Sequence, residues 1–450
     1  MHEPIITVSG LRGVVGESLT PEVAIRYVTA FAAIAPPGPI VVARDSRPSG
    51  RMLSDVVHAG LAAAGRDTLD AGVAATPTTG VLVRQHAAAG AVEITASHNP
   101  SPYNGLKLFS VEGRVIPASQ GARVLQQYRD PAPEWVPHNQ LGHRFECDDP
   151  HGPHLAAVLA TVDVERIRAR QFTVLLDSNH GAGSLLGRRL LEALGCRITV
   201  LGGERDGQFE HPPEPTAENL AGVLSAVVEA HADVGFCQDP DADRLAVIDA
   251  AGRYLGEEYT LAMCLDHVLR QRHGPVVTNC ATSRMAQDLA RRYGVPYVRS
   301  AVGEPNVADA MMEHGAVFGG EGNGGPIDPR VILVRDSFVG MAQLLDAMVA
   351  RGMTIAQLGA ELPRYEIHKT KTQFPLERLP AALAALRQRF ADAQADRQDG
   401  LRLDWPDRWL LLRGSNTEPI VRAIAEAPTA SEAQSLCEAA MAVLTELRGS

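Results

Sequence analysis

The sequence lacks the features that mark several large classes of protein. None of its apolar runs is long enough to span a bilayer, and its start, Met1–Pro4, lacks the basic residues of a signal peptide. Its six cysteines form no CxxC pair, which is typical of reduced thiols in a cytoplasmic protein. Basic residues are in the minority, 42 against 53 acidic ones, so the formal net charge is −11. We therefore expect a cytoplasmic protein whose main partners are neither nucleic acid nor membrane.

The composition that remains is globular, with 45% hydrophobic and 21% charged residues over 450 positions. At about 150 residues per domain, this length predicts about three domains, with four small ones allowed. Three stretches share one order of elements: an apolar strand, a helix that begins near a serine and ends at a glycine, and a second strand. The first strands and serines are 40–43 with Ser49, 173–176 with Ser184 and 275–278 with Ser283, and the second strands are 68–73, 197–201 and 296–302. This alternation predicts α/β domains with mixed, mostly parallel sheets.

Each of these stretches continues to a third apolar strand that ends in a polar or glycine-rich loop. The three loops are Thr95–Pro100, Asp239–Arg244 and Gly319–Gly325. In α/β sheets, ligands gather outside the carboxyl ends of the strands, where these loops lie. We therefore expect three topologically similar domains that present different chemistries to one cleft. No Walker sequence accompanies the loops, so nucleotide binding is not indicated.

The C-terminal part of the chain follows a different pattern. A helix near 380–390, a strand at 409–412, a polar loop at 413–419, a strand to Ala425 and a helix from about Ser431 predict a fourth domain of α+β type. We expect domain boundaries at 1–150, 151–256, 257–365 and 366–450, with the Pro- and His-rich stretch 131–153 as the first linker. The sequence leaves the oligomeric state open.

Asp239, Asp241 and Asp243 place three carboxylates on alternate residues. In an extended loop, such side chains point the same way and can converge on one hard cation. The stretch is not a 12-residue loop ending in Glu, which excludes an EF-hand, and its open positions favour Mg²⁺ bound to a phosphoryl oxygen. The alternative is a solvated acidic turn at the surface. The apolar strand that precedes the aspartates favours the metal site over this alternative.

Ser97 lies at the matching position one domain earlier, followed by His98. It could simply begin a helix, and without a G-x-S-x-G elbow an acyl-transfer triad has little support. A hydroxyl near Mg²⁺ is instead a plausible phosphoryl acceptor and donor. The turn before Lys107 returns that lysine toward the same loop, where it fits a phosphate clamp or a proton carrier as well as a surface role.

Two further groups of residues suit a phosphorylated sugar. A compact set of donors near the C-terminus matches the needs of a phosphate dianion, although an ordinary polar turn would look similar; it consists of Arg413, Ser415, Asn416, Thr417 and Arg422. Glu321 and Asn323, between glycines, offer an acceptor and an amide for sugar hydroxyls. Arg12, between Gly10 and Gly13, suits close approach to an anion, although this signal alone is weak.

Taken together, these loops resemble the α-D-phosphohexomutase superfamily over essentially the whole chain. Four motifs in the correct order carry the resemblance: Thr95–Pro100, Asp239–Arg244, Gly320–Asn323 and Arg413–Pro419. Members of this superfamily have three similar α/β domains and a mobile, phosphate-binding fourth domain around a central cleft. The resemblance implies an enzyme that interconverts hexose 6-phosphates and 1-phosphates through a phosphoserine and a hexose 1,6-bisphosphate.

The resemblance also implies roles for individual residues. Ser97 would be the phosphoserine, and one of its phosphoryl oxygens would complete a Mg²⁺ site made by Asp239, Asp241 and Asp243. Arg12, His98 and Lys107 would surround the transferred group, with Lys107 as the first choice for general acid–base catalysis. The remaining roles concern binding: Arg244 to the phosphoryl group or sugar, Glu321 and Asn323 to sugar hydroxyls, and Arg413, Ser415, Asn416, Thr417 and Arg422 to the non-reacting phosphate.

This sequence departs from the superfamily pattern at three places. Pro240 and Ala242 stand between the aspartates, where many members have glycines. The sugar loop continues as Asn323-Gly324-Gly325, where Ser-Gly-His is common, and Gly303-Glu304 ends a substrate-binding loop that often ends in a basic residue. The carboxylate of Glu304 would suit an amino sugar, and the glycine-rich loop is similar to that of members assigned to phosphoglucosamine. We therefore expect glucosamine phosphate as substrate, with mannose and glucose phosphates close behind.

Two other functions remain as alternatives. A Mg²⁺-dependent phosphohydrolase would let water take the phosphoryl group from Ser97, but a second phosphate clamp would then have no clear use. A sugar-phosphate sensor that had lost catalysis would need neither Ser97 nor the metal-binding aspartates. A mutase explains all of these residues at once.

Overall fold

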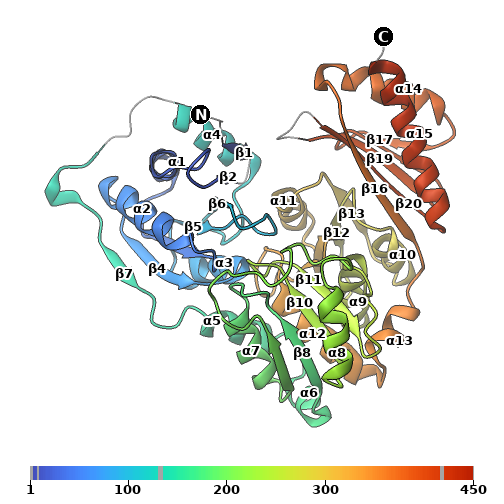
Figure 1. The fold of residues 1–450 in the computed structure, drawn as a ribbon, viewed down its shortest axis with the longest axis horizontal. Coiled ribbons are helices and arrows are strands. Elements are labelled where there is room, and N and C mark those ends of the chain that lie inside the picture. The colour runs from blue at the N-terminus through green and yellow to red at the C-terminus, as the bar shows by residue number, and fades with distance from the viewer. Residues whose placement is uncertain (1–3, 8–9, 130–134, 416–419, 449–450) are drawn as a thin grey trace.

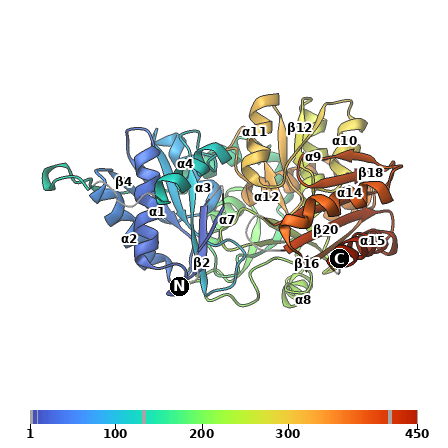
Figure 2. The ribbon, with the colours of Figure 1, turned by 90° about the horizontal axis from the view of Figure 1, so that it is seen from above.

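The computed structural model describes residues 4–7, 10–129, 135–415 and 420–448 and contains four β-sheets in chain order (Figure 1). The domain around the first sheet (blue) lies opposite the C-terminal domain (red), and the second and third domains connect them (Figures 1 and 2). Among the described residues, no helix has the length and apolar character needed to cross a membrane. All six cysteines are free thiols.

The first sheet has seven strands in the order β1-β2-β6-β5-β3-β4-β7. Its strands are β1 (Ile5–Thr7), β2 (Gly10–Val14), β3 (Ile40–Arg44), β4 (Thr68–Val73), β5 (Gly90–Ile94), β6 (Tyr103–Phe109) and β7 (Arg144–Glu146). The accompanying helices are α1 (Pro21–Ile34), α2 (Gly50–Ala63), α3 (Thr76–Gln85) and α4 (Ala118–Arg129), followed by the short 3₁₀ helix η1 (His138–Gln140). The stretch expected as a linker thus carries β7, which pairs with β4 at the sheet edge.

The second and third sheets have four strands each, in the orders β11-β10-β8-β9 and β13-β12-β14-β15. The second domain contains α5 (Gly152–Leu159), α6 (Val164–Arg170), β8 (Thr173–Asp177), α7 (Ser184–Ala193), β9 (Arg197–Leu201), α8 (Ala221–Glu229), β10 (Val234–Gln238) and β11 (Leu245–Asp249). The third contains α9 (Glu257–Gln271), β12 (Val276–Asn279), α10 (Met285–Arg292), β13 (Tyr297–Ser300), α11 (Glu304–His314), β14 (Phe318–Glu321), β15 (Gly325–Ile327), α12 (Ser337–Arg351) and α13 (Ile355–Ala360).

The three sheets repeat one topology. In each, the first strand of the unit is central and pairs in parallel with the other two: β3 with β4 and β5, β8 with β9 and β10, β12 with β13 and β14. The third strand then turns back through an antiparallel hairpin, to β6, β11 or β15. The prediction of three similar, mostly parallel α/β domains is confirmed. The three polar loops follow β5, β10 and β14, so each extends from the carboxyl end of a strand beside the central one.

The fourth domain is built on an antiparallel sheet in the order β16-β20-β19-β18-β17. Its elements are β16 (Glu366–Gln373), the 3₁₀ helix η2 (Leu376–Arg378), α14 (Leu379–Arg389), β17 (Gln394–Asp396), β18 (Leu401–Asp404), β19 (Trp409–Gly414), β20 (Ile420–Ala427) and α15 (Ala430–Arg448). Helices α14 and α15 cover one face with an apolar core of their own. On the other face, Trp409 and Leu411 pack against Cys280 of the third domain, which attaches the fourth domain to the rest.

Side chains of the central strand β3 point alternately to the two faces of the first sheet, and helices cover both faces. Ile40 and Val42 face a core shared with α1 and α2, whereas Val41 and Ala43 face the core that contains α3. A strand of a parallel sheet that is covered on both faces reads as a continuous apolar run, and this is the pattern that the sequence shows there.

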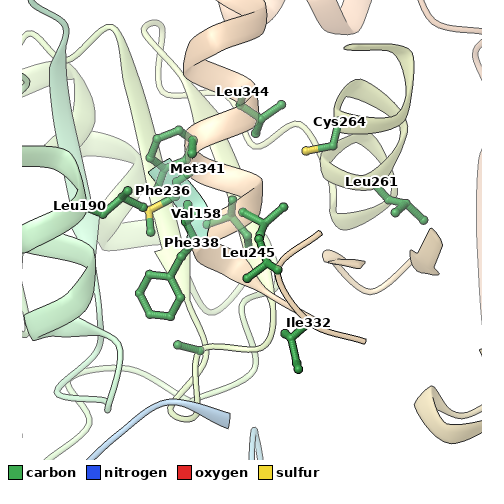
Figure 3. Packing of buried hydrophobic residues seen from close by; sticks show 14 of the residues in the cluster. Val158, Leu190, Phe236, Leu245, Leu261, Cys264, Ile332, Phe338, Met341 and Leu344 are labelled. Carbon is green, nitrogen blue, oxygen red and sulfur yellow. The ribbon is translucent and has the colours of Figure 1, made fainter. Parts of the chain in front are cut away.

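The largest core continues through the first three domains, and α12 lies at its centre. Although α12 belongs to the third domain in the chain, it contacts α5, α6 and α7 of the second as well as α9. Phe338, Met341 and Leu344 of α12 pack among Leu190 of α7 and Phe236 of β10 (Figure 3). This continuous packing makes the second and third domains one rigid support for the loops at their strand ends.

Replacement of Phe236 by alanine is expected to destabilise this support by about 3 to 5 kcal/mol, because the ring is completely buried and its loss leaves a cavity. The measurement is the midpoint of urea unfolding followed by tryptophan fluorescence. Val228→Ala is the control, since the Val228 side chain on α8 is 45% exposed. Equal effects of the two substitutions would contradict the central place of this core.

Candidate active site

The loop after β5 is held in shape by Asp45 and Arg47, which follow β3. Arg47 donates to the carbonyl oxygens of Ser97, Asn99, Pro100 and Tyr103, at 2.5 to 3.0 Å, and its Nε pairs with Asp45 at 3.0 Å. Asp45 also accepts from Thr95, whose hydroxyl in turn accepts from the amide of Ser97. These bonds hold Ser97 at φ +49°, a left-handed conformation that costs free energy for a non-glycine residue and is found at functional sites.

Ser97 is buried and its hydroxyl faces the second domain. Its Oγ donates to Oδ2 of Asp239 at 2.9 Å and lies 3.2 Å from Nδ1 of His98. The structure therefore brings together a hydroxyl and a carboxylate that are 142 residues apart in the chain. A second contact between these domains is the bond from the amide of Thr76, at the start of α3, to the carbonyl of Asp241.

The three aspartates after β10 are fully buried and offer carboxylate oxygens within 4.8 Å of one another. In Asp241, Oδ2 accepts from Thr76 at 2.7 Å and from Lys107 at 3.0 Å; in Asp243, Oδ2 pairs with Arg335 at 2.5 Å and with Lys107 at 3.3 Å. The Oδ1 atoms of Asp241 and Asp243 have no hydrogen-bond partner. Buried carboxylate oxygens without partners are costly, and a divalent cation between them would remove that cost. The donor set thus fits Mg²⁺.

The close packing of the three carboxylates shifts the pKa values of Asp239 and Asp241 in opposite directions. Burial, with repulsion from Asp241 and Asp243, raises the pKa of Asp239 well above its ordinary value. Burial also acts to raise the pKa of Asp241, but Lys107 and the bond from Thr76 hold it below its ordinary value. The neighbouring cations thus do not stabilise all three carboxylates in their charged form, as expected where a further cation binds.

Lys107 lies on β6 with its Nζ against Asp241 and Asp243. Burial would lower the pKa of this ammonium, but the two aspartates and Glu304 raise it above its ordinary value. The lysine is therefore charged and completes the ring of groups around the aspartates. Its hydrogen bonds go to Thr76, Asp241 and Asp243 rather than to Ser97.

Arg12, His98 and Arg244 lie around the same point. Arg12, on β2, donates to the Asn99 side chain at 2.9 Å, and Arg244 donates its amide to Asp239 while its buried Nε has no hydrogen-bond partner. Burial and the neighbouring cations Arg244 and Arg12 lower the pKa of His98 well below its ordinary value, so the imidazole is neutral. Two guanidinium groups and a neutral imidazole thus accompany the serine.

The sugar loop after β14 contacts both neighbouring loops. Oε1 of Glu321 accepts from Asn279 at 2.7 Å and from the amide of Gly303 at 3.1 Å, and its Oε2 pairs with Arg335 at 3.1 Å. The carbonyl of Gly324 accepts from the amide of Leu245, just after the aspartates. Glu304, at the start of α11, is buried and pairs with Arg335 through Oε2, while its Oε1 and the Oδ1 of Asn323 have no hydrogen-bond partner.

The candidate phosphate clamp of the fourth domain lies on β19 and β20. Arg413 and Arg422 are cross-strand neighbours, and Lys371 of β16 is the next partner in the same row. Like charges placed opposite each other destabilise a sheet unless an anion bridges them. Asp399 pairs with Arg413 at 2.9 Å and accepts from the amide of Val302, which connects this row to the Gly303-Glu304 loop. Ser415 is buried at the end of β19, and Asn416 and Thr417 lie outside the described residues.

The sequence reasoning missed Arg47, Thr76, Arg335 and Lys371. Arg47 could have been found, since it lies in the polar loop at the carboxyl end of β3, beside β5. Arg335 gave a weaker signal, a charged pair Arg335-Asp336 between an apolar stretch and α12. Thr76 and Lys371 belong to a helix start and an edge strand that carry no motif.

A serine hydroxyl lies beside three buried carboxylates and several cations. These are the groups that a metal-assisted phosphoryl-transfer enzyme uses. Four family models match the chain in succession. They are described as phosphoglucomutase/phosphomannomutase alpha/beta/alpha domains I, II and III, at residues 5–133, 152–252 and 257–365, and the C-terminal domain, at 372–443. The chain belongs to the phosphoglucomutase/phosphomannomutase family of the α-D-phosphohexomutase superfamily and is a phosphohexomutase. The resemblance seen in the sequence is confirmed.

Similar proteins are named either phosphoglucomutase/phosphomannomutase or phosphoglucosamine mutase. A phosphoglucomutase/phosphomannomutase of Thermococcus kodakarensis is 36% identical over 446 residues, which cover 97% of each chain. A probable phosphoglucosamine mutase of Methanopyrus kandleri is 33% identical over 432 residues, 95% of each chain. Among solved structures, a phosphoglucomutase/phosphomannomutase family protein of Burkholderia thailandensis superposes with a TM-score of 0.86 at 26% identity, covering 98% of this chain and 97% of the other. The family is therefore shown, and the names of the relatives leave the sugar open.

Proposed function

We propose that this enzyme moves a phosphoryl group between positions 1 and 6 of a hexose through phospho-Ser97 and a hexose 1,6-bisphosphate, with glucosamine phosphate as its preferred substrate. The observation that carries the proposal is the 2.9 Å contact between Ser97 Oγ and Asp239, because it unites a nucleophile with the carboxylate cluster of another domain. We propose four functional units with boundaries at 1–150, 151–256, 257–365 and 366–450, each supplying one loop.

Asp239, Asp241 and Asp243 would hold Mg²⁺, together with an oxygen of phospho-Ser97. The Oδ1 atoms of Asp241 and Asp243, which have no hydrogen-bond partner, support this assignment. When bound, the cation supplies neutralisation of the charge on the transferred phosphoryl oxygens. Lys107 and Arg335 each hold the other oxygen of a cluster aspartate, so the ligand set is pre-oriented by the protein.

In the forward half-reaction, the free hydroxyl of the hexose monophosphate forms a new O–P bond while the Ser97 Oγ–P bond breaks. The hydroxyl proton leaves to a base and Ser97 regains a proton, so that the products are free serine and the bisphosphate. We assign the acid–base work to Lys107: its ammonium would give a proton to Ser97 Oγ and then take up the proton of the sugar hydroxyl, so that it ends charged again. His98 lies close to Ser97 Oγ, and Arg12 and Arg244 would neutralise the charge of the moving group. The bisphosphate then turns over and returns its other phosphoryl group to Ser97 by the reverse steps.

The non-reacting phosphate would be held by the fourth domain. Arg413 and Arg422 form part of a row of three cations with Lys371, which supports an anion site there. Ser415, Asn416 and Thr417 are the further proposed donors. Because the substrate presents phosphate at either end, this clamp must accept both orientations of the sugar, which Glu321 and Asn323 would hold through its hydroxyls.

The preference for an amino sugar rests on acceptor atoms. Oε1 of Glu304 and Oδ1 of Asn323 are buried without hydrogen-bond partners. The 2-amino group of glucosamine phosphate is a hydrogen-bond donor from which Oε1 of Glu304 or Oδ1 of Asn323 would accept. Gly303-Glu304 forms the start of α11 beside Glu321. Mannose and glucose phosphates offer a hydroxyl instead and are the competing substrates.

A phosphorus NMR time course tests both the reaction and the sugar. The enzyme is incubated with Mg²⁺, a catalytic amount of hexose 1,6-bisphosphate, and glucosamine, mannose or glucose 6-phosphate in turn. We expect a 1-phosphate signal with each, and kcat/KM higher for glucosamine phosphate by about tenfold, the effect of about 1.4 kcal/mol from a charge-assisted hydrogen bond. Glu304→Gln should reduce this preference more than it reduces turnover of mannose phosphate.

Each contrary result has a definite meaning. An enzyme far faster on mannose than on glucosamine phosphate would defeat the sugar assignment while leaving the mutase intact. Inorganic phosphate as the only product would favour a phosphohydrolase. No change with any sugar, despite a phosphorylated Ser97, would favour a sensor.

A further inference from the structure

Arg335, in the segment between β15 and α12, lies among carboxylates from three different loops. Its guanidinium pairs with Oδ2 of Asp243 at 2.5 Å, with Oε2 of Glu304 at 2.8 Å and with Oε2 of Glu321 at 3.1 Å. Its side chain is only 10% exposed. One buried cation thus bridges the aspartate loop of the second domain and two loops of the third, the sugar loop with Glu321 and the Gly303-Glu304 loop.

In two of these three pairs, the second oxygen of the carboxylate has no hydrogen-bond partner. Arg335 occupies Oδ2 of Asp243 and Oε2 of Glu304, and in both residues the other carboxylate oxygen has no hydrogen-bond partner. The planar guanidinium donates in fixed directions, so it determines how each carboxylate is rotated. The free oxygens of the aspartate cluster and of the sugar loop are therefore oriented by the same side chain.

Gly325 and Glu304 both lie directly against this arginine. A methyl group on Gly325 would lie 2.7 Å from Cγ and 2.9 Å from Cβ of Arg335, so only glycine leaves room for the arginine there. Arg335 also places its cation directly against the buried carboxylate of Glu304, at 2.8 Å. Its positive charge also acts on Arg12 and His98, whose pKa values it helps to lower.

We propose that Arg335 is a positioning residue of the phosphoryl-transfer site, which orients Asp243 for the metal and Glu304 and Glu321 for the sugar. This inference rests on the proposed function. In this arrangement Gly325 leaves room for Arg335, and Arg335 pairs with Glu304.

The first test compares Arg335→Met and Arg335→Lys with Arg330→Met. Arg330 lies on the same segment and also pairs with a buried aspartate, Asp328, which keeps Arg272 and Gln343 as partners when Arg330 is lost. Binding of Mn²⁺, measured by electron paramagnetic resonance without substrate, is expected to weaken about 10- to 100-fold in Arg335→Met, less in Arg335→Lys and not in Arg330→Met. KM for the sugar phosphate should rise most in Arg335→Met, less in Arg335→Lys and not in Arg330→Met, since Glu304 loses its cation and Glu321 loses one of its three partners.

The second test uses the contact with Gly325. The backbone of Gly325 is not in the left-handed region, so alanine is excluded there only by its neighbours. Gly325→Ala is expected to weaken Mn²⁺ binding about tenfold by displacing Arg335, and to add less than about twofold in an Arg335→Gly background, where the space is free. Equal losses in both backgrounds would overturn the coupling.

Loss of Arg335 leaves buried carboxylates unpaired, and Arg335→Met could unfold for that reason. The double variant Glu304→Gln/Arg335→Met removes one of these charges, and its thermal midpoint identifies a folded protein on which the Mn²⁺ measurement is repeated. Wild-type Mn²⁺ affinity and KM in a folded Arg335 variant would overturn the inference while the mutase stands. Absence of sugar-phosphate isomerisation by the unmodified enzyme, with Mn²⁺ binding still dependent on Arg335, would instead overturn the proposed function.

Discussion

Replacement of Ser97 by alanine is expected to reduce interconversion of hexose phosphates by at least about 10⁴-fold, because it removes the hydroxyl proposed to carry the phosphoryl group between the two sugar positions. The measurement is the phosphorus NMR time course, together with the intact mass of the protein after incubation with hexose 1,6-bisphosphate. Wild-type enzyme should gain one phosphoryl group and Ser97→Ala none.

Ser101→Ala is the matched control, since Ser101 is an exposed serine of the same loop. The substitution at position 97 keeps a Cβ on a residue at φ +49°, so it removes the hydroxyl without relieving or adding backbone strain. A Ser97→Ala enzyme with more than about a tenth of wild-type turnover would show that the phosphoryl group travels by another route. In that case the contact between Ser97 and Asp239 would have only a structural meaning.

Asp241→Asn should have the next largest effect, a loss of metal affinity of about 100-fold or more and a fall in kcat of about 10³-fold. The substitution removes a charge from the cluster and one of the two carboxylates that hold Lys107, at 3.0 Å. The hydroxyl of Thr76, at the start of α3, also loses its charged acceptor. Metal affinity is measured by isothermal titration with Mg²⁺, and kcat by the sugar-phosphate assay at saturating Mg²⁺.

Asp249→Asn is the control for general disturbance of this hairpin. Asp249 ends β11, is as buried as the cluster aspartates, and bonds to Arg253 and to turn amides instead of to the site. Its amide variant should be less stable but bind Mg²⁺ normally. Chelation of the wild-type enzyme should abolish turnover reversibly, and an Asp241→Asn enzyme with normal Mg²⁺ affinity would remove Asp241 from the ligand set.

The repeated βαβ order could be read from the sequence because its signal is local. Strand β3 is an apolar run with turn residues after it, and α2 shows apolar residues on one face, so each element carries its own pattern. The position of α12 could not be read in this way. Its twelve buried residues leave almost no polar face, which indicates burial but not that its contacts would be α5, α6 and α7 of the second domain.

For the site, the loops that carry a motif were predictable and the groups that hold them were not. Asp239, Asp241 and Asp243 have characteristic spacing, and Ser97 shares their topological position, so both could be named. Arg335 is a single arginine in an unremarkable segment, 92 residues from the aspartate that it pairs with. Pairing over such a distance leaves no local pattern, because the two residues become neighbours only when the second and third sheets pack.

The sequence by itself determined the number and type of the α/β units, the loops proposed to hold the chemistry, and the family, since these depend on short-range periodicity and on residues next to one another in the chain. Tertiary structure alone decided that Ser97 meets Asp239, that Lys107 holds two aspartates, and that Arg335 joins three loops. Those contacts depend on the orientation of whole sheets around the shared core of α12, and long-range packing of this kind is a property of all the residues together.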